Sequence, residues 1–180
     1  YANYAGRMID SIRGKLCVSF GPTIHAFHVI SPGTEQGFSQ PMASSSWDGL
    51  TPLNAFDGEA QSYWMPSPKA ADPGPWIGFD FGHDAARNPG RVKIEWLKAN
   101  LVAPSIEVQY ADWGQEWRSA GVFPTEAATT SSLTSEHALP AGFGDHRLWR
   151  IVFHGLTRRL VAVREIRFLD RTSQDASEVK

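Results

Sequence analysis

The sequence predicts an all-β protein, built as a sandwich of two antiparallel sheets. The first observation is strict alternation, as in the segment where Val92, Ile94 and Trp96 share one face and Lys93 and Glu95 the other. The second is that such runs end in clusters of Gly, Pro, Asn, Asp or Ser. The third is that each run has one apolar face to bury, which suits two sheets packed face to face. Because strands do not alternate with helices, a doubly wound nucleotide-binding fold is excluded.

Nine strands are expected along the chain, separated by turn residues. They are expected at residues 16–20, 23–30, 40–45, 76–81, 91–97, 105–111, 117–122, 147–154 and 163–170. Two long stretches without strand character, 46–75 and 125–144, are rich in Pro, Gly, Ser, Thr and Ala. In a sandwich such loops gather at the ends, and loops of this length usually carry the function.

The N-terminal segment shows helical spacing over residues 1–17. Apolar residues recur there at intervals of three and four, at Ala5, Met8, Ile9, Ile12 and Leu16. Gly6 and Gly14 weaken this pattern. We expect a short, helical, amphipathic arm that packs on the domain or on a neighbouring subunit. The predicted organisation is an arm and extension at 1–38, a sandwich at 39–171 and a tail at 172–180.

Composition and charge exclude several classes of protein. Among 180 residues, 17 Lys and Arg oppose 19 Asp and Glu, a net charge of −2, and no dense basic block occurs. A nucleic-acid partner is therefore not expected. The longest apolar stretches are far shorter than a membrane-spanning helix. Cys17 is the single cysteine, so an intrachain disulfide is impossible.

The seven tryptophans divide into two groups. Five lie within or beside alternating strands and are expected in the core: Trp64, Trp76, Trp96, Trp117 and Trp149. Trp47 and Trp113 instead occupy polar turns. An exposed indole of this kind suits stacking on a sugar ring or insertion into a bilayer interface. The alternative is a lid folded back over the end of the sandwich.

Five segments carry a family resemblance, in order along residues 40–170. They read MASSSWDGLTPLNAFDGEAQSYW (42–64), PWIGFDFG (75–82), VQYADWGQEW (108–117), HRLWRIVF (146–153) and VREIRFLD (163–170). Together they resemble the discoidin family, the coagulation factor V/VIII type C domains, which is similar to family 32 carbohydrate-binding modules. The resemblance implies an eight-stranded, galactose-binding-like jelly roll that binds ligands with the loops at one end and performs no chemistry of its own.

A cation-binding loop is expected around residues 54–64. Asp57 and Glu59 supply carboxylate oxygens, Ser62 a hydroxyl and Gly58 a tight turn, and Ca²⁺ takes six to eight such oxygens. The resemblance implies a structural Ca²⁺ held by Asn54, Asp57, Glu59, Ser62 and Glu165, with backbone oxygens from Asn54 and Ser62. The alternative is that Asp57 accepts hydrogen bonds from loop amides and Glu165 pairs with Arg164 or Arg167.

The resemblance also implies a ligand site made of an aromatic side chain and a few polar ones on loops. The candidates by position are Trp47, Asp48, Tyr63, His83, Arg87, Phe143 and His146. The chain has no nucleophile elbow, phosphate loop, Cys-x-x-Cys pair or zinc-protease motif. We therefore expect no enzymatic activity.

Two functions from different classes follow. The first is a non-catalytic module that recognises carbohydrate. The second is a structural or assembly domain that contacts a protein neighbour in a surface or phage-type virion assembly and oligomerises through the N-terminal arm. Lipid recognition is not expected, because only Trp47 and Phe143 offer hydrophobic spikes and the paired terminal cysteines of lipid-binding relatives are missing. Either function, including a role in cell adhesion, places the protein outside the cell or on a cell or particle surface.

Overall fold

The protein forms two compact units, residues 1–36 and residues 37–180. The computed structural model describes residues 9–12, 15–20, 23–28, 39–68, 74–82, 84–125, 133–156 and 160–171. All predicted ligand and metal residues belong to the second unit.

The first unit contains a three-stranded antiparallel sheet in the order β1-β2-β3. Its strands are β1 (Ile9–Ile12), β2 (Lys15–Phe20) and β3 (Thr23–His28). The helical arm expected over 1–17 is therefore wrong for the described residues 9–12 and 15–17. Ile9 pairs with Val18 and Ile12 with Lys15, so hydrogen bonds to a partner strand outweigh a helical pattern already weakened by glycine.

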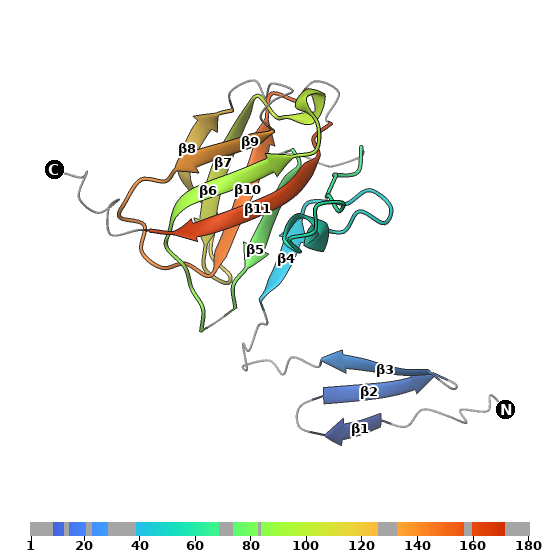
Figure 1. Ribbon diagram of the computed structural model, residues 1–180. Helices are drawn as coiled ribbons and strands as arrows, with labels where there is room; N and C mark the ends of the chain where they lie inside the picture. The colour runs from blue at the N-terminus through green and yellow to red at the C-terminus, as the bar shows by residue number, and fades with distance from the viewer. Residues whose placement is uncertain are drawn as a thin grey trace. The chain divides into compact units, whose positions relative to one another are not determined.

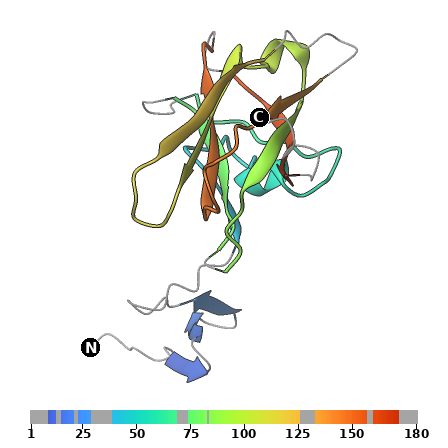
Figure 2. The same cartoon turned by 90° about the vertical axis from the view of Figure 1, so that its left-hand side faces the viewer.

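The second unit is a sandwich of two antiparallel sheets, as the sequence predicts. One sheet has the order β4-β5-β10-β7-β8 and the other the order β11-β6-β9. The strands of the first are β4 (Gln40–Ala43), β5 (Trp76–Asp80), β10 (Leu148–His154), β7 (Ser105–Ala111) and β8 (Arg118–Pro124). Those of the second are β11 (Val163–Asp170), β6 (Pro89–Trp96) and β9 (Thr134–Ala138). Figures 1 and 2 show the two layers face to face.

Three elements lie where no regular structure was expected. Strand β9 falls inside the stretch 125–144, which was expected to be a loop. Two short 3₁₀ helices, η1 (Pro52–Ala55) and η2 (Ala99–Leu101), lie between strands. Strand β9 is an edge of its sheet. Its residues alternate between exposed and half-buried, but not between apolar and polar. Its sequence therefore carries no strong alternation that would predict a strand.

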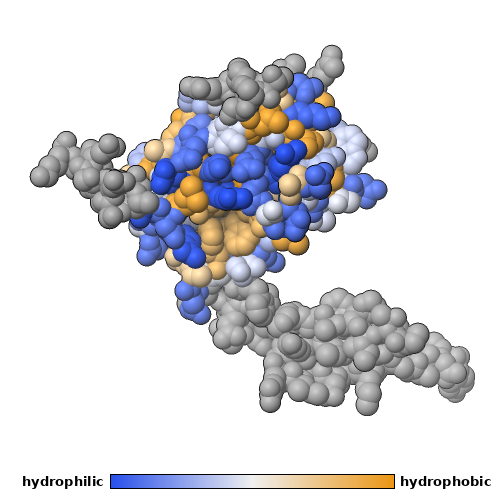
Figure 3. All heavy atoms as spheres, viewed as in Figure 1, coloured by the Kyte–Doolittle hydropathy of each residue, from blue (hydrophilic) through white to orange (hydrophobic). Residues whose placement is uncertain are grey.

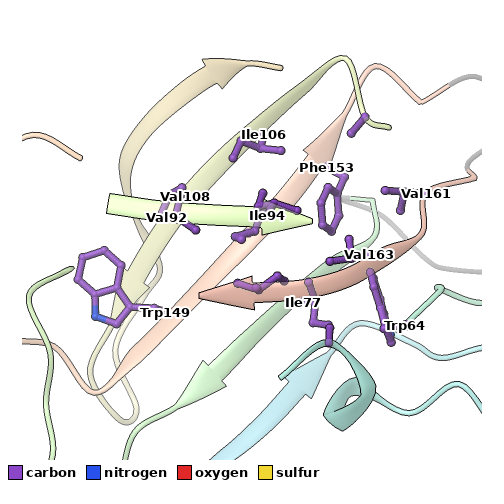
Figure 4. Packing of buried hydrophobic residues seen from close by; sticks show 14 of the residues in the cluster. Trp64, Ile77, Val92, Ile94, Ile106, Val108, Trp149, Phe153, Val161 and Val163 are labelled. Atoms are coloured by element: carbon purple, nitrogen blue, oxygen red, sulfur yellow. The ribbon is translucent and has the colours of Figure 1, made fainter. Parts of the chain in front are cut away.

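The core lies between the two sheets and follows the predicted alternation. Along β6, Val92, Ile94 and Trp96 are buried while the residues between them are not. Trp64 and Trp149 are also fully buried, and Figure 4 shows them toward opposite sides of the cluster, with Ile and Val side chains between. At about 25 cal/mol per Å² of apolar surface removed from water, these large side chains dominate the stability of the sandwich.

Two tryptophans expected in the core lie instead on the outer face of the five-stranded sheet. Trp76 and Trp117 are only partly buried, and their ring centroids are 6.4 Å apart. The guanidinium of Arg150 lies 5.1 Å from the Trp76 ring and 4.1 Å from the Trp117 ring. Because Ile77 faces the core, its neighbour Trp76 must face outward. The indoles there pack against a cation rather than in the core.

The outer face of the three-stranded sheet is strongly polar. Lys93 and Arg167 of adjacent strands are paired in register there, as are Glu95 and Glu165. Arg91 Nη1 contacts Glu136 Oε1 at 3.0 Å across β6 and β9. Figure 3 shows hydrophilic residues gathered over the middle of this face. Charges of both signs alternate on it, so it has no field of one sign.

The strand registers place the connecting loops at two ends of the sandwich. Gln40 and Leu148 both pair with Asp80, and Asp170 pairs with Pro89. Strand β4 therefore begins, and β11 ends, at the same end, which we call the base. The described loops of the base are 84–88, 112–117 and 139–147. The other end, which we call the apex, has the described loops 44–68, 97–104 and 160–162.

Candidate functional site

The seven predicted ligand residues do not lie together. Trp47, Asp48 and Tyr63 are in the apical loop 44–68, whereas Arg87, Phe143 and His146 are at the base. His83 lies outside the described residues. The strand registers separate these groups, and for Phe143 and His146 they do so through β9, a strand that was not expected inside 125–144. The candidates therefore form two sites, which differ in how their side chains are engaged.

At the base, the predicted ligand side chains already have partners within the chain. Arg87 Nη1 lies 3.1 Å from Asp170 Oδ2. The ring of His146 stacks on Tyr110 at 4.3 Å, with Nδ1 at 3.0 Å from Asp112 Oδ2 and Nε2 at 2.7 Å from the Phe143 carbonyl. These contacts fix the base loops on the sandwich rather than leaving them open to a ligand.

The pKa of Asp112 reflects these contacts at the base. Burial raises its pKa, but hydrogen bonds from His146 and from the backbone N–H of Arg147, with the charge of His146, outweigh burial and hold the pKa below its usual value. Asp112 therefore stays ionised and holds His146 beside the β7–β8 hairpin. The role of this cluster is to attach the hairpin loop to the start of β10.

Trp113, at the tip of that hairpin, is 59% exposed. The guanidinium of Arg147 lies 4.7 Å from its ring centroid. Arg147 in turn forms a buried two-pronged ion pair with Asp80, with Nε–Oδ1 at 2.7 Å and Nη2–Oδ2 at 2.9 Å. One face of this indole therefore covers a structural ion pair, which is the lid arrangement that the sequence left open.

At the apex, Trp47 is held by its backbone while its side chain stays 43% exposed. Its N–H donates to the Met65 carbonyl at 2.8 Å, and Leu50 N–H donates to the Trp47 carbonyl at 2.9 Å. The second bond closes a four-residue turn in which Gly49 takes φ +73°, a conformation that favours glycine. The turn therefore displays an indole, with exposed Asp48 next to it.

The segment before Trp47 is anchored by a buried indole. Trp64 Nε1 donates to the Ser45 carbonyl and lies within hydrogen-bond distance of Ser46 Oγ, each at 3.1 Å. Trp64 also bridges Val163 of β11 through backbone bonds of 2.8 and 3.0 Å. The loop that carries Trp47 is thus attached to the core, so the exposed indole has a defined position.

A hollow of about 380 Å³ lies in the neighbouring apical loops. It is lined by Leu97, Lys98, Ala99, Asn100 and Leu133. Backbone bonds order the loops across the apex: Trp47 bonds Met65, Trp64 bonds Val163, and Ala162 bonds Leu97 and Leu101. The hollow therefore belongs to the same end as Trp47. Sequence reasoning missed Lys98 and Asn100, because nothing in a short polar loop distinguishes a lining residue from a solvated one.

The predicted calcium residues do come together. Three oxygens surround Ser62 Oγ: the Asn54 carbonyl at 3.2 Å, Asp57 Oδ1 at 2.8 Å and the Glu59 carbonyl at 2.9 Å. Glu165, far away in sequence, reaches the same loop, since its Oε2 accepts the Gly58 N–H at 3.1 Å. A hydroxyl has one proton, so it can satisfy only one of the three acceptors at a time. The donor set is one that a hard cation would complete.

The carboxylates of this loop also favour a bound cation. Burial raises the pKa of Glu165 and the Asp57 carboxylate adds to the rise, while the Gly58 N–H and Arg167 act in the opposite direction; the net shift is upward. The contacts of the alternative are also present, since Asp57 Oδ1 accepts the Glu59 N–H at 2.9 Å and Glu165 Oε1 lies 3.6 Å from Arg167 Nε. Nowhere among the described residues do three or more His, Cys, Asp or Glu side chains form a metal-binding group. A cation here would need backbone and hydroxyl oxygens.

A comparison with known protein families finds one that matches this chain. Residues 38–144, more than half of the chain, match the F5/8 type C domain family. None of the curated protein sequences matches significantly. Among the described helices, none is long and apolar enough to cross a membrane.

Solved structures share the sandwich at low sequence identity. CpGH89CBM32-5 from Clostridium perfringens, in complex with GalNAc-β-1,3-galactose, is 12% identical with a TM-score of 0.59, over 73% of this chain and 95% of that one. The F5/8 type C domain of a Bacteroides fragilis protein is 16% identical with a TM-score of 0.60, over 74% and 92%. The CBM32 of AlyQ, in complex with 4,5-unsaturated mannuronic acid, is 20% identical with a TM-score of 0.55, over 71% and 91%.

Longer proteins match over one part only. The chain spans 15% of the length of a family 89 glycoside hydrolase from Clostridium perfringens and 30% of AlyQ truncated to its CBM32 and alginate lyase domains. These likenesses establish the fold of residues 37–180 and nothing of the reactions those enzymes perform.

Proposed function

This chain belongs to the F5/8 type C domain family, and we propose that it is a non-catalytic carbohydrate-binding module of an extracellular or surface-exposed protein. The ligand site is at the apex, with Trp47 as the stacking platform and Asp48 and Tyr63 beside it. Relatives with this sandwich that were solved with a galactose-containing disaccharide and with a mannuronic acid derivative support carbohydrate as the ligand class.

The observation that carries this proposal is the exposed, anchored indole of Trp47. The Trp47 indole is left 43% exposed in a polar turn, so much of its apolar surface stays in water, yet six backbone and side-chain hydrogen bonds hold its loop in place. Sugar rings present apolar C–H faces that stack on such an indole.

The apical hollow is a second feature of the same end of the sandwich. Lys98 and Asn100 are exposed at its rim, and Leu97 and Leu133 form apolar wall. A volume of about 380 Å³ is within the range of small-ligand pockets. Amide and ammonium groups recognise sugar hydroxyls by hydrogen bonds, so a sugar unit can also be bound in this hollow.

The test compares two exposed tryptophans at opposite ends of the sandwich. Trp47→Ala should weaken glycan binding at least tenfold, about 1.4 kcal/mol or more, in an array screen followed by calorimetric titration. Trp113→Ala is the matched control and should leave the Kd unchanged. If Trp113→Ala abolishes binding and Trp47→Ala does not, the site is at the base. If neither the wild type nor the variants bind any glycan, the proposal is wrong.

We further propose a structural Ca²⁺ in the loop of Asn54, Asp57, Glu59 and Ser62, closed by Glu165. The carbonyl oxygens of Asn54 and Glu59, Asp57 Oδ1 and the Ser62 hydroxyl would hold the ion, with the Glu165 carboxylate across the loop. Here the hydroxyl of Ser62, rather than its backbone oxygen, faces the other donors. The ion would hold loop 44–68 to β11 and so stabilise the position of Trp47.

Calcium is tested by thermal unfolding with excess Ca²⁺ and with chelator. A ligand that binds only the folded state raises the Tm, by mass action. The wild type and the control Glu116→Gln should gain stability from Ca²⁺, whereas Glu165→Gln should not. Glu165→Gln should also unfold at a higher temperature than the wild type in chelator, because it removes a buried charge near Asp57. An identical wild-type Tm in both buffers would refute the metal site.

A second function, assembly with a protein neighbour, is favoured by the first unit. Within its described residues β1, β2 and β3 form one sheet, and a sheet is stable when another layer covers one of its faces. A second copy of this chain can supply that layer. Light scattering of the full chain and of residues 37–180 tests this: we expect an oligomer for the first and a monomer for the second. A monomeric full chain would exclude self-assembly.

A further inference from the structure

A second cavity, of about 300 Å³, lies where the two sheets meet at an open edge of the sandwich. Strand β8 is the edge of one sheet and β9 the edge of the other, and the ring of Phe123 on β8 lies 5.4 Å from the ring of His137 on β9. Figure 1 shows β8 and β9 on the same side of the sandwich. The cavity is lined by Pro124, Thr134, Ser135, Glu136 and His137. None of these residues belongs to the apical site.

His137 is the unusual member of this lining. It pairs with Val92 in register, which turns its side chain inward, toward the space between the sheets. Its Nε2 is buried and has no hydrogen-bond partner within the described part of the chain. A buried polar nitrogen without a hydrogen-bond partner destabilises the folded state. A ligand that hydrogen-bonds to this nitrogen would remove the cost.

Together with Arg91, the lining of this cavity carries no net charge at neutral pH. Burial lowers the pKa of His137, so its imidazole is uncharged at neutral pH and carries one donor and one acceptor nitrogen. The carboxylate of Glu136 is balanced by Arg91 at 3.0 Å. An anion gains nothing from these groups, and a metal ion would find one imidazole and no free carboxylate. The chemistry suits an uncharged partner.

Hydroxyl groups and an aromatic wall complete the surface. Ser135 Oγ accepts the Trp96 indole N–H at 3.1 Å, so its own proton can be donated. Ser135 pairs with Ile94 and so faces inward like His137, and the Phe123 ring lies against His137. A hydroxyl ligand both donates and accepts, so it can satisfy Nε2 in either tautomer and also accept from Ser135.

We propose that this cavity is a second binding site, for one neutral hydroxyl-rich molecule such as a single sugar ring or a polyol. Its volume is about ten times the ~30 Å³ share of one water in the liquid and is at the lower bound of ligand pockets. The site acts independently of Trp47, because it lies between the sheet edges and shares no residue with the apical loops.

The experiment is an NMR titration of the full chain with D-galactose, D-glucose, D-mannose and glycerol in turn. We expect saturable shifts of the backbone amides of residues 134–137 and of the His137 ring with at least one of these probes. The same shifts should occur in Trp47→Ala, which separates this site from the apical one. His137→Phe keeps an aromatic ring against Phe123 but removes the nitrogens, and should weaken the cavity response about fivefold or more.

Each outcome decides the proposal. Shifts at residues 134–137 that persist in Trp47→Ala and weaken in His137→Phe support it, even if the apical site binds no glycan. Shifts confined to residues 44–68 and 97–104, or no saturable shift with any probe, overturn it and leave the cavity to water. Ser135→Ala is the second variant should His137→Phe fail to fold, and its cavity affinity must fall if the hydroxyl contributes; an unchanged affinity counts against the proposal.

Discussion

At the base of the sandwich, a buried ion pair contributes more to stability than an exposed one. The side chains of Arg147 and Asp80 are 9% and 3% exposed, whereas those of Arg87 and Asp170 are 48% and 71% exposed. Removing one partner of a buried pair leaves the other charge without compensation, which costs about 3–5 kcal/mol, while an exposed pair contributes about 0–1 kcal/mol.

We therefore predict that Arg147→Ala lowers the free energy of unfolding by several kcal/mol and that Arg87→Ala changes it by less than about 1 kcal/mol. Urea unfolding at neutral pH measures both variants. Arg147→Ala should also leave Trp113 without the cation beneath its ring, so its fluorescence should shift toward that of a solvated indole. Equal losses in the two variants would contradict the distinction between the pairs.

His137 gives a pH dependence whose sign follows from burial. Burial lowers its folded-state pKa below the ordinary value of about 6.5. The unfolded chain then binds the proton more readily, so the contribution of His137 to stability is complete above pH ~6.5 and is lost as the pH falls through the folded-state value. The residue thus favours unfolding on mild acidification.

The expected result is that wild-type stability declines between about pH 7 and 5 and that His137→Phe declines less steeply. Chemical unfolding at a series of pH values provides the two curves. Parallel curves would show that the buried imidazole does not contribute to the acid sensitivity.

At the scale of the elements, the pairing of β5 with β10 depends on a glycine in the middle of β5. A Cβ on Gly78 would fall against the backbone oxygen of Trp149 and within 2.7 Å of Arg150 Cβ. These are backbone and near-backbone atoms that cannot move without shifting β10. Arg150 is also the cation held between Trp76 and Trp117 on the outer face.

Gly78→Ala should therefore destabilise the sandwich by at least about 2 kcal/mol, as overpacking does. Gly114→Ala is the control: it has positive φ, +76°, but open space around its Cβ, so its cost should stay near 1 kcal/mol. Thermal or urea unfolding of both variants tests the ordering. A smaller loss for Gly78→Ala than for Gly114→Ala would mean that β10 shifts at little cost.

The strands also show where the alternation of apolar and polar residues predicts burial correctly and where it does not. The pattern in β6 correctly placed Val92, Ile94 and Trp96 inside, because a central strand of a sheet buries one face completely. The same rule read Trp76 and Trp117 as core, since an indole in a strand is usually buried. Only the pairing partners show that these two face outward, against Arg150.

At the scale of the whole molecule, the second unit contains its own core. Among the residues whose burial the structure describes, the hydrophobic cluster runs from Ala55 to Ile166, with partly buried neighbours from Ala43 to Phe168. We predict that residues 37–180 fold without the first unit, with a Tm within a few degrees of the full chain and the same glycan Kd. Calorimetry and binding titration of the truncated chain check this. A large fall in Tm would mean that the first unit covers part of the sandwich.

The sequence by itself determined the sandwich, its family and most strands, because alternation and short motifs are local and survive without tertiary information. It did not show that residues 9–12 form strand β1, because a partner strand supplies the hydrogen bonds of that segment. Nor could it separate Trp47, Asp48 and Tyr63 from Arg87, Phe143 and His146. The unexpected strand β9 divides the stretch 125–144, so only its pairing with β6 shows that Phe143 and His146 lie at the base, away from Trp47.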